Sequence, residues 1–262
     1  MKKLIYITIV CFFCAFLCLE QFTPVFAHQN EPMLAIVIDD FGQSRKGVAE
    51  MLNLKCPLTC AVMPGLEYSI KDANDAHSKG HEVILHMPME AHIKLPDSWY
   101  GPKVIRNYDT PEKAKKLLAK CIDETPHCEG VNIHIGSGVC LNKKLVTAIL
   151  EETKLKGKYF LDSRTHEGSV CGEVAPALSM DFIKRDFFLE EHGKVSLMHS
   201  QSELLKAANL ATTQGYAVAI GHVGPEGGIT TANAIANCLP QIEDMGVKIV
   251  PLSKIINTLK VG

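Results

Sequence analysis

The 262-residue chain carries almost no net charge, no low-complexity segment and only one tryptophan. Its 27 lysines and arginines nearly balance 29 aspartates and glutamates, for a formal net charge of -2, and the basic residues form no stripe. That balance argues against nucleic acid as a partner. No linker rich in serine, glycine or proline divides the sequence. Residues 28–262 are therefore predicted to form a single domain.

No two cysteines after residue 27 have the two-residue spacing of a structural zinc knuckle. Seven cysteines occur in this part of the chain: Cys56, Cys60, Cys121, Cys128, Cys140, Cys171 and Cys238. In an oxidising compartment an odd number leaves at least one free thiol, and spacing alone does not give the connectivity. Cys121 and Cys128, across a short loop, are the first pair to test. We interpret the seven as core residues or optional disulfides.

The first 27 residues have the pattern of a secretory signal peptide. Lys2 and Lys3 give a basic start, an apolar stretch runs from Leu4 to Leu19, and Ala27 is the small residue before the expected cut at His28. A retained anchor is the less favoured alternative, because the apolar stretch is shorter than the roughly 20 residues of a spanning helix. The protein is therefore predicted to be exported, to the periplasm or beyond, with no stable membrane span after cleavage.

Eight apolar runs have the length of buried strands, and helix patterns fall between most of them. The runs are residues 33–38, 58–62, 82–87, 130–134, 158–161, 183–189, 216–221 and 247–251. Capping residues predict where several helices begin: Thr110 before Pro111, Asn142, and Ser200 or Ser202. Glycines predict where helices end: Gly80 after 67–79, Gly157 and Gly215. Pro240 is expected to bend or end a helix that begins near Thr231. Repeated strand and helix predict an α/β fold, an irregular (β/α) barrel, with an open doubly wound sheet as the alternative.

Five of the runs end in aspartate or histidine. These endings are Asp39 with Asp40, His86, His134, Asp162 and His222. A polar cap on a buried strand would explain any one of them. The carboxyl ends of parallel strands meet at one rim, however, so the whole set predicts a shared site that binds a metal or moves a proton.

A long segment between residues 88 and 109 interrupts the alternation of strands and helices. It contains Trp99, the one tryptophan of the chain, followed by Tyr100. A long loop at the active rim can form a substrate wall, and an aromatic face can stack on a sugar ring. Trp99 as an anchor that only pins the loop to the barrel is an equally good interpretation.

Several motifs in a fixed order carry a family resemblance. They are Ile38-Asp39-Asp40-Phe41-Gly42, Leu85-His86-Met87-Pro88-Met89-Glu90, Gly130-Val131-Asn132-Ile133-His134-Ile135-Gly136-Ser137, Phe160-Leu161-Asp162-Ser163, Arg185-Asp186 and Ile220-Gly221-His222. Together they resemble the divergent polysaccharide deacetylase (YibQ-like) family, which is related to the NodB-like carbohydrate esterases. The resemblance covers about residues 33–259. It implies an irregular seven-stranded (β/α) barrel that removes acetyl groups from an envelope or extracellular polysaccharide.

The resemblance also implies roles for five residues. Asp39 would be the catalytic base, Asp40, His86 and His134 the metal ligands, and His222 the general acid. One carboxylate and two imidazoles leave an open position on a divalent ion, as in catalytic zinc sites, although cobalt, manganese and nickel stay open. The chain departs from the better-known deacetylases, because Glu90 stands four residues after His86 where they have a second histidine, and because Ile133 follows Asn132 where the family has paired asparagines.

Other polar residues are assigned supporting parts. Asp186 or Asp162 could orient His222, though Asp186 could equally form a structural ion pair with Arg185. Glu90 is expected to fix His86 from outside the ligand set. Ser137, with the glycine before it, either offers N–H groups to an oxyanion or caps a helix.

One geometric problem remains in this assignment. Neighbours on a strand point to opposite faces, so Asp39 and Asp40 can both enter the site only if the chain bends after Ile38. Phe41 and Gly42 are the expected source of the bend.

Three functions agree with these observations. The first is a metal-dependent deacetylase of an envelope or extracellular polysaccharide, with Zn²⁺ as the expected cofactor and a glycan as the partner. The second is a non-catalytic envelope protein that binds a metal or glycan on the same fold. The third is another metallohydrolase, such as an amidase or phosphoesterase, because fold does not fix the reaction.

Overall fold

A parallel β-sheet curls around the centre of the computed structural model, which describes residues 31–191 and 195–260. The predicted signal peptide lies outside the described residues. The strands are β1 (Met33–Phe41), β2 (Thr59–Val62), β3 (Glu82–Met89), β4 (Cys128–Ile135), β5 (Tyr159–Asp162), β6 (Phe182–Lys184), β7 (Phe187–Phe188), β8 (Tyr216–His222) and β9 (Lys248–Ile249). Their order is β6-β5-β4-β3-β2-β1-β8-β7, with β9 paired to β1, and every pairing is parallel.

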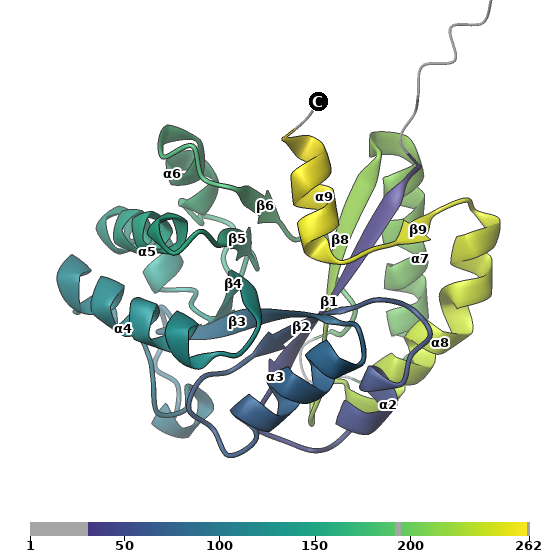
Figure 1. Ribbon diagram of the computed structural model, residues 1–262, viewed down its shortest axis with the longest axis horizontal. Coiled ribbons are helices and arrows are strands. Elements are labelled where there is room, and N and C mark those ends of the chain that lie inside the picture. The colour runs from purple at the N-terminus through teal and green to yellow at the C-terminus, as the bar shows by residue number, and fades with distance from the viewer. Residues whose placement is uncertain (1–30, 192–194, 261–262) are drawn as a thin grey trace, which may run out of the picture. The chain divides into compact units, whose positions relative to one another are not determined.

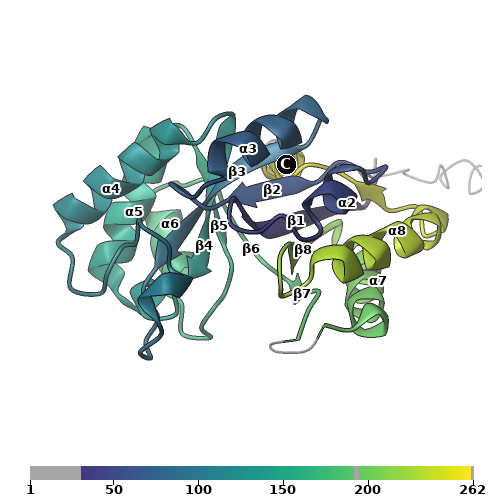
Figure 2. The same ribbon diagram turned by 90° about the horizontal axis from the view of Figure 1, so that it is seen from below.

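Helices surround the sheet on the outside, as Figure 1 shows. They are α2 (Val48–Leu52), α3 (Ser69–Ser78), α4 (Pro111–Glu124), α5 (Lys143–Leu155), α6 (Cys171–Ala177), α7 (Leu197–Gln214), α8 (Gly228–Asp244) and α9 (Leu252–Leu259), with short 3₁₀ turns η1 (Asp97–Trp99) and η2 (Val139–Leu141). Seen from below, α4, α5 and α6 cover one side of the strands and α2, α7 and α8 the other (Figure 2). No helix in the described part of the chain is long and apolar enough to cross a membrane.

The predicted irregular barrel is confirmed, with one difference in strand count. The segment 183–189, predicted as one strand, is broken into β6 and β7. Its first part pairs with β5, at Asp162 and Lys184, and its second part pairs with β8, at Phe187 and Ala219. This segment therefore joins the two edges of the sheet through the chain itself. The path of the sheet has eight strands instead of seven because of the break.

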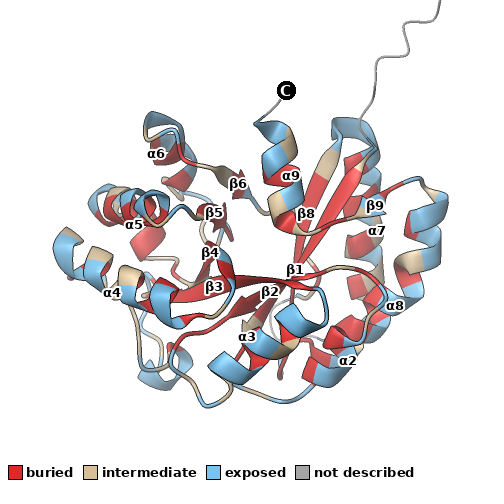
Figure 3. Ribbon diagram, viewed as in Figure 1, coloured by how far each residue is buried: buried red, intermediate tan, exposed pale blue. Residues whose placement is uncertain are grey.

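The two faces of each strand serve different parts of the core. In β1 the residues Leu34, Ile36 and Ile38 pack outward against the helices. The alternate residues Met33, Ala35 and Val37 face the barrel interior with Ile84, Leu161, Val218 and Ile220. Both faces of the strands are therefore buried, whereas the helices keep an exposed outer side (Figure 3).

Helix α9 closes the barrel at the amino ends of the strands. Its residues Leu252, Ile255 and Ile256 belong to the same apolar cluster as the interior of the barrel. The N–H of Ser253 donates to the Glu82 carboxylate at 3.2 Å, and the N–H of Leu252 donates to Thr59 Oγ1 at 3.0 Å. Because this end is plugged, the interior is accessible from the carboxyl ends of the strands.

Two helices begin earlier than predicted. Helix α7 begins at Leu197 and is capped by Ser196, whose Oγ accepts from the N–H of His199, so that Ser200 lies buried inside the helix. Helix α8 begins at Gly228, and Pro240 lies within it, one turn before its end at Asp244. The caps at Thr110 and Asn142 are confirmed, since each side chain accepts from N–H groups of the first turn.

All seven cysteines of the described chain are free and buried. Cys121 and Cys128, the first pair to test for a disulfide, are separate thiols of one apolar cluster. Cys128 Sγ donates to the carbonyl oxygen of Gly130 at 3.2 Å. Burial raises the pKa of both thiols to about 11. The structure therefore agrees with the interpretation of the cysteines as core residues.

Candidate active site

The alternation of the strands aims five side chains into the open end of the barrel. Asp39 continues the inward series of β1, and His222 continues that of β8, where the two residues are paired in register. On β3 and β4, Leu85, Met87, Val131 and Ile133 pack outward, which leaves the alternate residues His86, Asn132 and His134 facing inward. Residues far apart in the sequence are thereby brought to one rim.

Asp40 reaches the same site through a bulge in β1. The register with β2 shifts between Ile38 and Phe41, where β1 carries one extra residue. Asp40 has a left-handed backbone, with a φ of 70°, and Gly42 follows with a φ of 102°. The predicted bend is therefore present, and it is centred on Asp40 itself. Buried Asp72 holds it from α3 by accepting the N–H of Gly42 at 2.9 Å.

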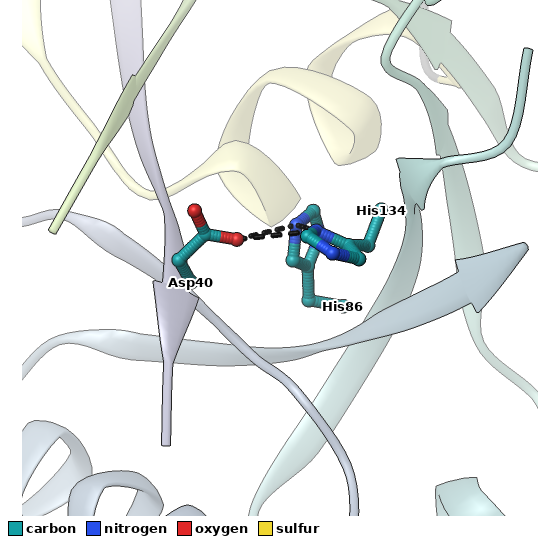
Figure 4. Close-up of side chains that lie close together, drawn as sticks. All are labelled: Asp40, His86 and His134. Carbon is teal, nitrogen blue, oxygen red and sulfur yellow. Dashed lines mark hydrogen bonds and ion pairs between the residues drawn. The ribbon is translucent and has the colours of Figure 1, made fainter. Parts of the chain in front are cut away.

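Asp40, His86 and His134 point their polar atoms at one another (Figure 4). Asp40 Oδ1 lies 3.4 Å from His86 Nε2 and 3.2 Å from His134 Nδ1, and the two nitrogens are 3.1 Å apart. No other group of three potential ligands is this close among the residues that the structure describes. Two ligands on a tetrahedral zinc ion stand about 3.3–3.4 Å apart, given bond lengths of about 2.0–2.1 Å. The three atoms therefore have a spacing suited to one small cation.

The second nitrogen of each imidazole fixes its tautomer. His134 Nε2 is 2.9 Å from the carbonyl oxygen of Trp99, which can only accept, so this nitrogen carries the proton. Asn132 donates its amide N–H to Asp39 Oδ1 at 2.8 Å, which leaves its oxygen to accept from His86 Nδ1 at 2.7 Å. In the neutral form of both rings the nitrogen that faces Asp40 therefore has a free lone pair, as a metal ligand requires.

A cation also resolves an unpaired polar atom. Asp40 Oδ1 is buried without a hydrogen-bond partner. Burial alone would raise the pKa of Asp40, but His134 and His86 outweigh it and hold the pKa well below its usual range. Burial would lower the pKa of His86, and Asp39 and Asp40 raise it instead. Asp40 and His86 are therefore each stabilised in the charged form by a nearby group of opposite charge. The donor set of one carboxylate and two imidazoles fits a divalent metal.

Asp39 lies beside this group without belonging to it. Its Oδ2 is 3.7 Å from His86 Nε2, and its Oδ1 accepts from Asn132. Burial raises the pKa of Asp39, although the neighbouring His86 and His222 lower it in part. A carboxylate with a raised pKa next to the open side of a metal position can accept a proton from water.

His222, the register partner of Asp39 on the neighbouring strand, forms a pair with Glu190. Glu190 Oε2 lies 2.9 Å from His222 Nδ1, and Glu190 Oε1 accepts from the N–H of His222 at 3.1 Å and from Thr231 Oγ1 at 2.5 Å. Burial would lower the pKa of His222, but the hydrogen bond and charge of Glu190 raise it to about 10. The imidazole therefore keeps its proton at neutral pH and can act as an acid.

Glu190 replaces the two aspartates predicted to orient His222. Asp162 follows the outward face of β5, because Tyr159 and Leu161 point inward, and its oxygens accept from Arg164 N–H and Ser169 Oγ. Asp186 Oδ2 accepts from the N–H of Val218 at 2.9 Å. The sequence held the signal for Glu190, since the run Phe187-Phe188-Leu189 ends in it. The strand-end pattern does not include Glu190, because its endings are aspartate and histidine alone.

Three further assignments change in the structure. Arg185 donates to the carbonyl oxygens of Ser163 and Arg164 and lies over the Phe188 ring, in place of an ion pair with Asp186. Glu90 accepts from Arg106 and from the N–H of Asn107, so Asn132 fixes His86 in its place. The N–H of Gly136 donates to Met89, and Ser137 Oγ accepts from the N–H of His92, which makes the oxyanion role unsuitable for the glycine.

Trp99 stands at the rim and is 55% exposed, while Tyr100 beside it is buried. Its backbone contacts a candidate metal ligand, through the carbonyl oxygen that accepts from His134. In the same β3–α4 loop, His92 Nδ1 is 2.9 Å from Ser137 Oγ, and the His92 and His166 rings are 5.2 Å apart. The loops after β3, β4 and β5 thus meet at these three polar side chains.

Comparison with known sequences shows that this chain matches one protein family and is similar to two proteins described below. The sequence profile of the divergent polysaccharide deacetylase family matches residues 36–256. The uncharacterized protein YibQ of Escherichia coli is 29% identical over 192 residues, which is 73% of this chain and 59% of that protein. An uncharacterized protein of Haemophilus influenzae is 30% identical over 196 residues, 73% of this chain and 67% of its own length. The chain thus spans less than two thirds of the E. coli relative.

Solved structures share the fold. An uncharacterized protein from Agrobacterium tumefaciens superimposes with a TM-score of 0.78 at 21% identity, over 86% of this chain and 89% of its own. The Xyl-CE4 domain of a multidomain xylanase from the hindgut metagenome of Trinervitermes trinervoides gives 0.55 at 11% identity, over 88% and 92%. A peptidoglycan N-acetylglucosamine deacetylase gives 0.54 at 12% identity, over 86% and 88%.

Proposed function

The chain belongs to the divergent polysaccharide deacetylase family, and we propose that it is a metal-dependent hydrolase that removes acetyl groups from an envelope or extracellular polysaccharide. The observation that carries this proposal is the convergence of Asp40, His86 and His134, with Asp39 and His222 next to each other at the same rim. Zn²⁺ is the ion we propose, since a carboxylate and two imidazoles with an open position are typical of catalytic zinc. The leader-like first 27 residues support a place of action outside the cytoplasm.

Each residue has a defined part in this reaction. A divalent ion held by Asp40, His86 and His134 would lower the pKa of water to about 7 and polarise the acetyl carbonyl. Asp39 accepts the proton that the attacking water loses, because its carboxylate lies beside the ligand group without belonging to it. His222 donates its proton to the leaving amine or hydroxyl oxygen. The products are acetate and the deacetylated sugar.

The substrate proposal comes from the family and from the solved relatives. Two of the solved structures with the same fold are a xylanase-associated Xyl-CE4 domain and a peptidoglycan N-acetylglucosamine deacetylase. The exposed Trp99 and the polar His92 and Ser137 of the neighbouring loops suit a sugar, whose apolar face stacks on an aromatic ring while its hydroxyls bind polar groups.

The test is acetate release by the protein expressed from His28 and loaded with Zn²⁺. Substrates are acetylated chito-oligosaccharides, peptidoglycan and acetylated xylan, and the matched control is Asp39→Asn. We expect release from at least one glycan by the native protein and little by the variant. No release from the whole panel by protein that holds one ion per chain would contradict the proposal.

A further inference from the structure

The loop between β3 and α4, residues 90–110, contacts both the candidate metal site and the open mouth of the barrel. Its inner contact is the carbonyl oxygen of Trp99, 2.9 Å from His134 Nε2. On its outer side it presents Trp99 to solvent, a large apolar residue that is more than half exposed. One residue therefore touches a ligand with its backbone and solvent with its ring.

Internal contacts hold this loop in its position. Arg106 donates to Asp97 at 2.8 Å and to Glu90 at 3.4 Å, and its guanidinium lies 4.9 Å from the centre of the Tyr100 ring. The Tyr100 hydroxyl accepts from the N–H of Ala91 at 3.1 Å. Arg106 thus joins both ends of the loop to the residue that follows Trp99.

The hydrogen bond to Trp99 matters for the metal because it decides which nitrogen of His134 is free. If the loop moves away, Nε2 loses its acceptor and the tautomer with a free Nδ1 is no longer favoured. Outer hydrogen bonds of this kind typically change metal affinity about 10–100-fold. The position of the loop and the affinity for metal are therefore linked.

We propose that this loop couples glycan binding to the metal site, with the Trp99 ring as the platform for a sugar and the Trp99 carbonyl as the anchor of His134. The nature of the ligand rests on the proposed function, whereas the link between loop and metal does not. Coupling of two binding events is reciprocal, so a glycan raises the affinity for metal by the factor by which metal raises the affinity for glycan.

The single tryptophan makes the coupling directly measurable by fluorescence. Zn²⁺ is titrated into metal-free protein, with and without an N-acetylated chito-oligosaccharide, while Trp99 emission is recorded. We expect each ligand to change the emission and to tighten the binding of the other. Emission that responds to neither, in protein shown to bind Zn²⁺, would overturn the proposal.

Variants separate the two halves of the coupling. Arg106→Ala leaves all three ligands in place and loosens the loop, and we expect it to lower Zn²⁺ affinity about tenfold or more. Lys115→Ala, which removes an exposed ion pair with Glu151 between two outer helices, is the matched control and should bind Zn²⁺ normally. Trp99→Ala keeps the carbonyl and should lose glycan affinity while it retains Zn²⁺ affinity, as followed by calorimetry.

The outcomes distinguish this inference from the proposed function. Native Zn²⁺ affinity in a folded Arg106→Ala protein would overturn the coupling even if the enzyme releases acetate. Linked Zn²⁺ and glycan binding without acetate release from any substrate would uphold the coupling and contradict the deacetylase activity.

Discussion

The pair of His222 and Glu190 gives the sharpest prediction about the chemistry. Glu190→Gln removes the charge that raises the pKa of His222 to about 10. The oxygen of the new amide can still accept from the N–H of His222 and from Thr231, as Glu190 Oε1 does. Its NH₂ group then faces His222 Nδ1 and opposes protonation there.

The size of the effect follows from the lost charge. An opposite charge in direct contact shifts a pKa by about 1–3 units, so removing it should bring the pKa of His222 from about 10 to about 8. The raised pKa keeps the acid form up to higher pH, and the activity that needs it is lost as pH rises through that value. At pH 9 about 90% of the native imidazole and about 9% of the variant imidazole is protonated, whereas at pH 7 both are about 90% or more.

We therefore expect kcat/KM of Glu190→Gln to be about tenfold lower at pH 9 and nearly native at pH 7. The assay is acetate release across this range with Zn²⁺ at saturation, and an NMR titration of His222 in the metal-free protein measures the pKa without turnover. Glu203→Gln, on the surface helix α7 beside Lys206, is the control. A loss of equal size at both pH values, or an unchanged pKa, would refute the reasoning.

Three further predictions concern the metal and the fold. Asp40→Asn should lose the bound ion by elemental mass spectrometry, while Asp39→Asn keeps it and loses about a hundredfold or more in kcat; an ion retained in both would remove Asp40 from the ligand set. Asn132→Ala removes the acceptor that fixes the His86 imidazole, and it should lower Zn²⁺ affinity about 10–100-fold in a competition titration with a chelator. Native Zn²⁺ affinity would contradict that role of Asn132. Gly130→Ala should lower the free energy of unfolding by about 1–3 kcal/mol in urea, because its Cβ would lie 2.3 Å from a buried tyrosine ring. Gly172→Ala, which meets only one atom at 4.0 Å in a helix, should instead be neutral or stabilising.

The aspartates and histidines at the strand ends predict most of the site, because two regularities of parallel sheets act together. Parallel strands bring their carboxyl ends to one rim, and alternation decides which end residues face inward. His86 and His222 satisfy both conditions, and the structure places them accordingly. Asp162 satisfies the first alone, since the inward series of β5 is Tyr159 and Leu161. Alternation along β5 therefore predicts that Asp162 faces outward, away from the site.

Contacts made by loops could not be predicted in the same way. The partner of His134 is the backbone carbonyl of Trp99, and a carbonyl group is present at every residue, so no residue type marks it. Likewise Arg185 is held by two carbonyl oxygens where its neighbour Asp186 suggested an ion pair. Side-chain identity in the sequence predicts charge and ligand type, whereas backbone partners depend on the path of the loop.

Asp40 shows how far the sequence constrains this site. Two neighbouring aspartates cannot face one side of a regular strand, so the chain inserts an extra residue and turns Asp40 inward at a φ of 70°. Aspartate tolerates this left-handed backbone better than most residues, because its short side chain hydrogen-bonds locally. Asp40 is therefore constrained twice, as the candidate ligand and as the residue that makes the turn. Glutamate offers the same ligand atoms but a longer side chain and less tolerance of the turn, so chemical similarity alone would not preserve the site.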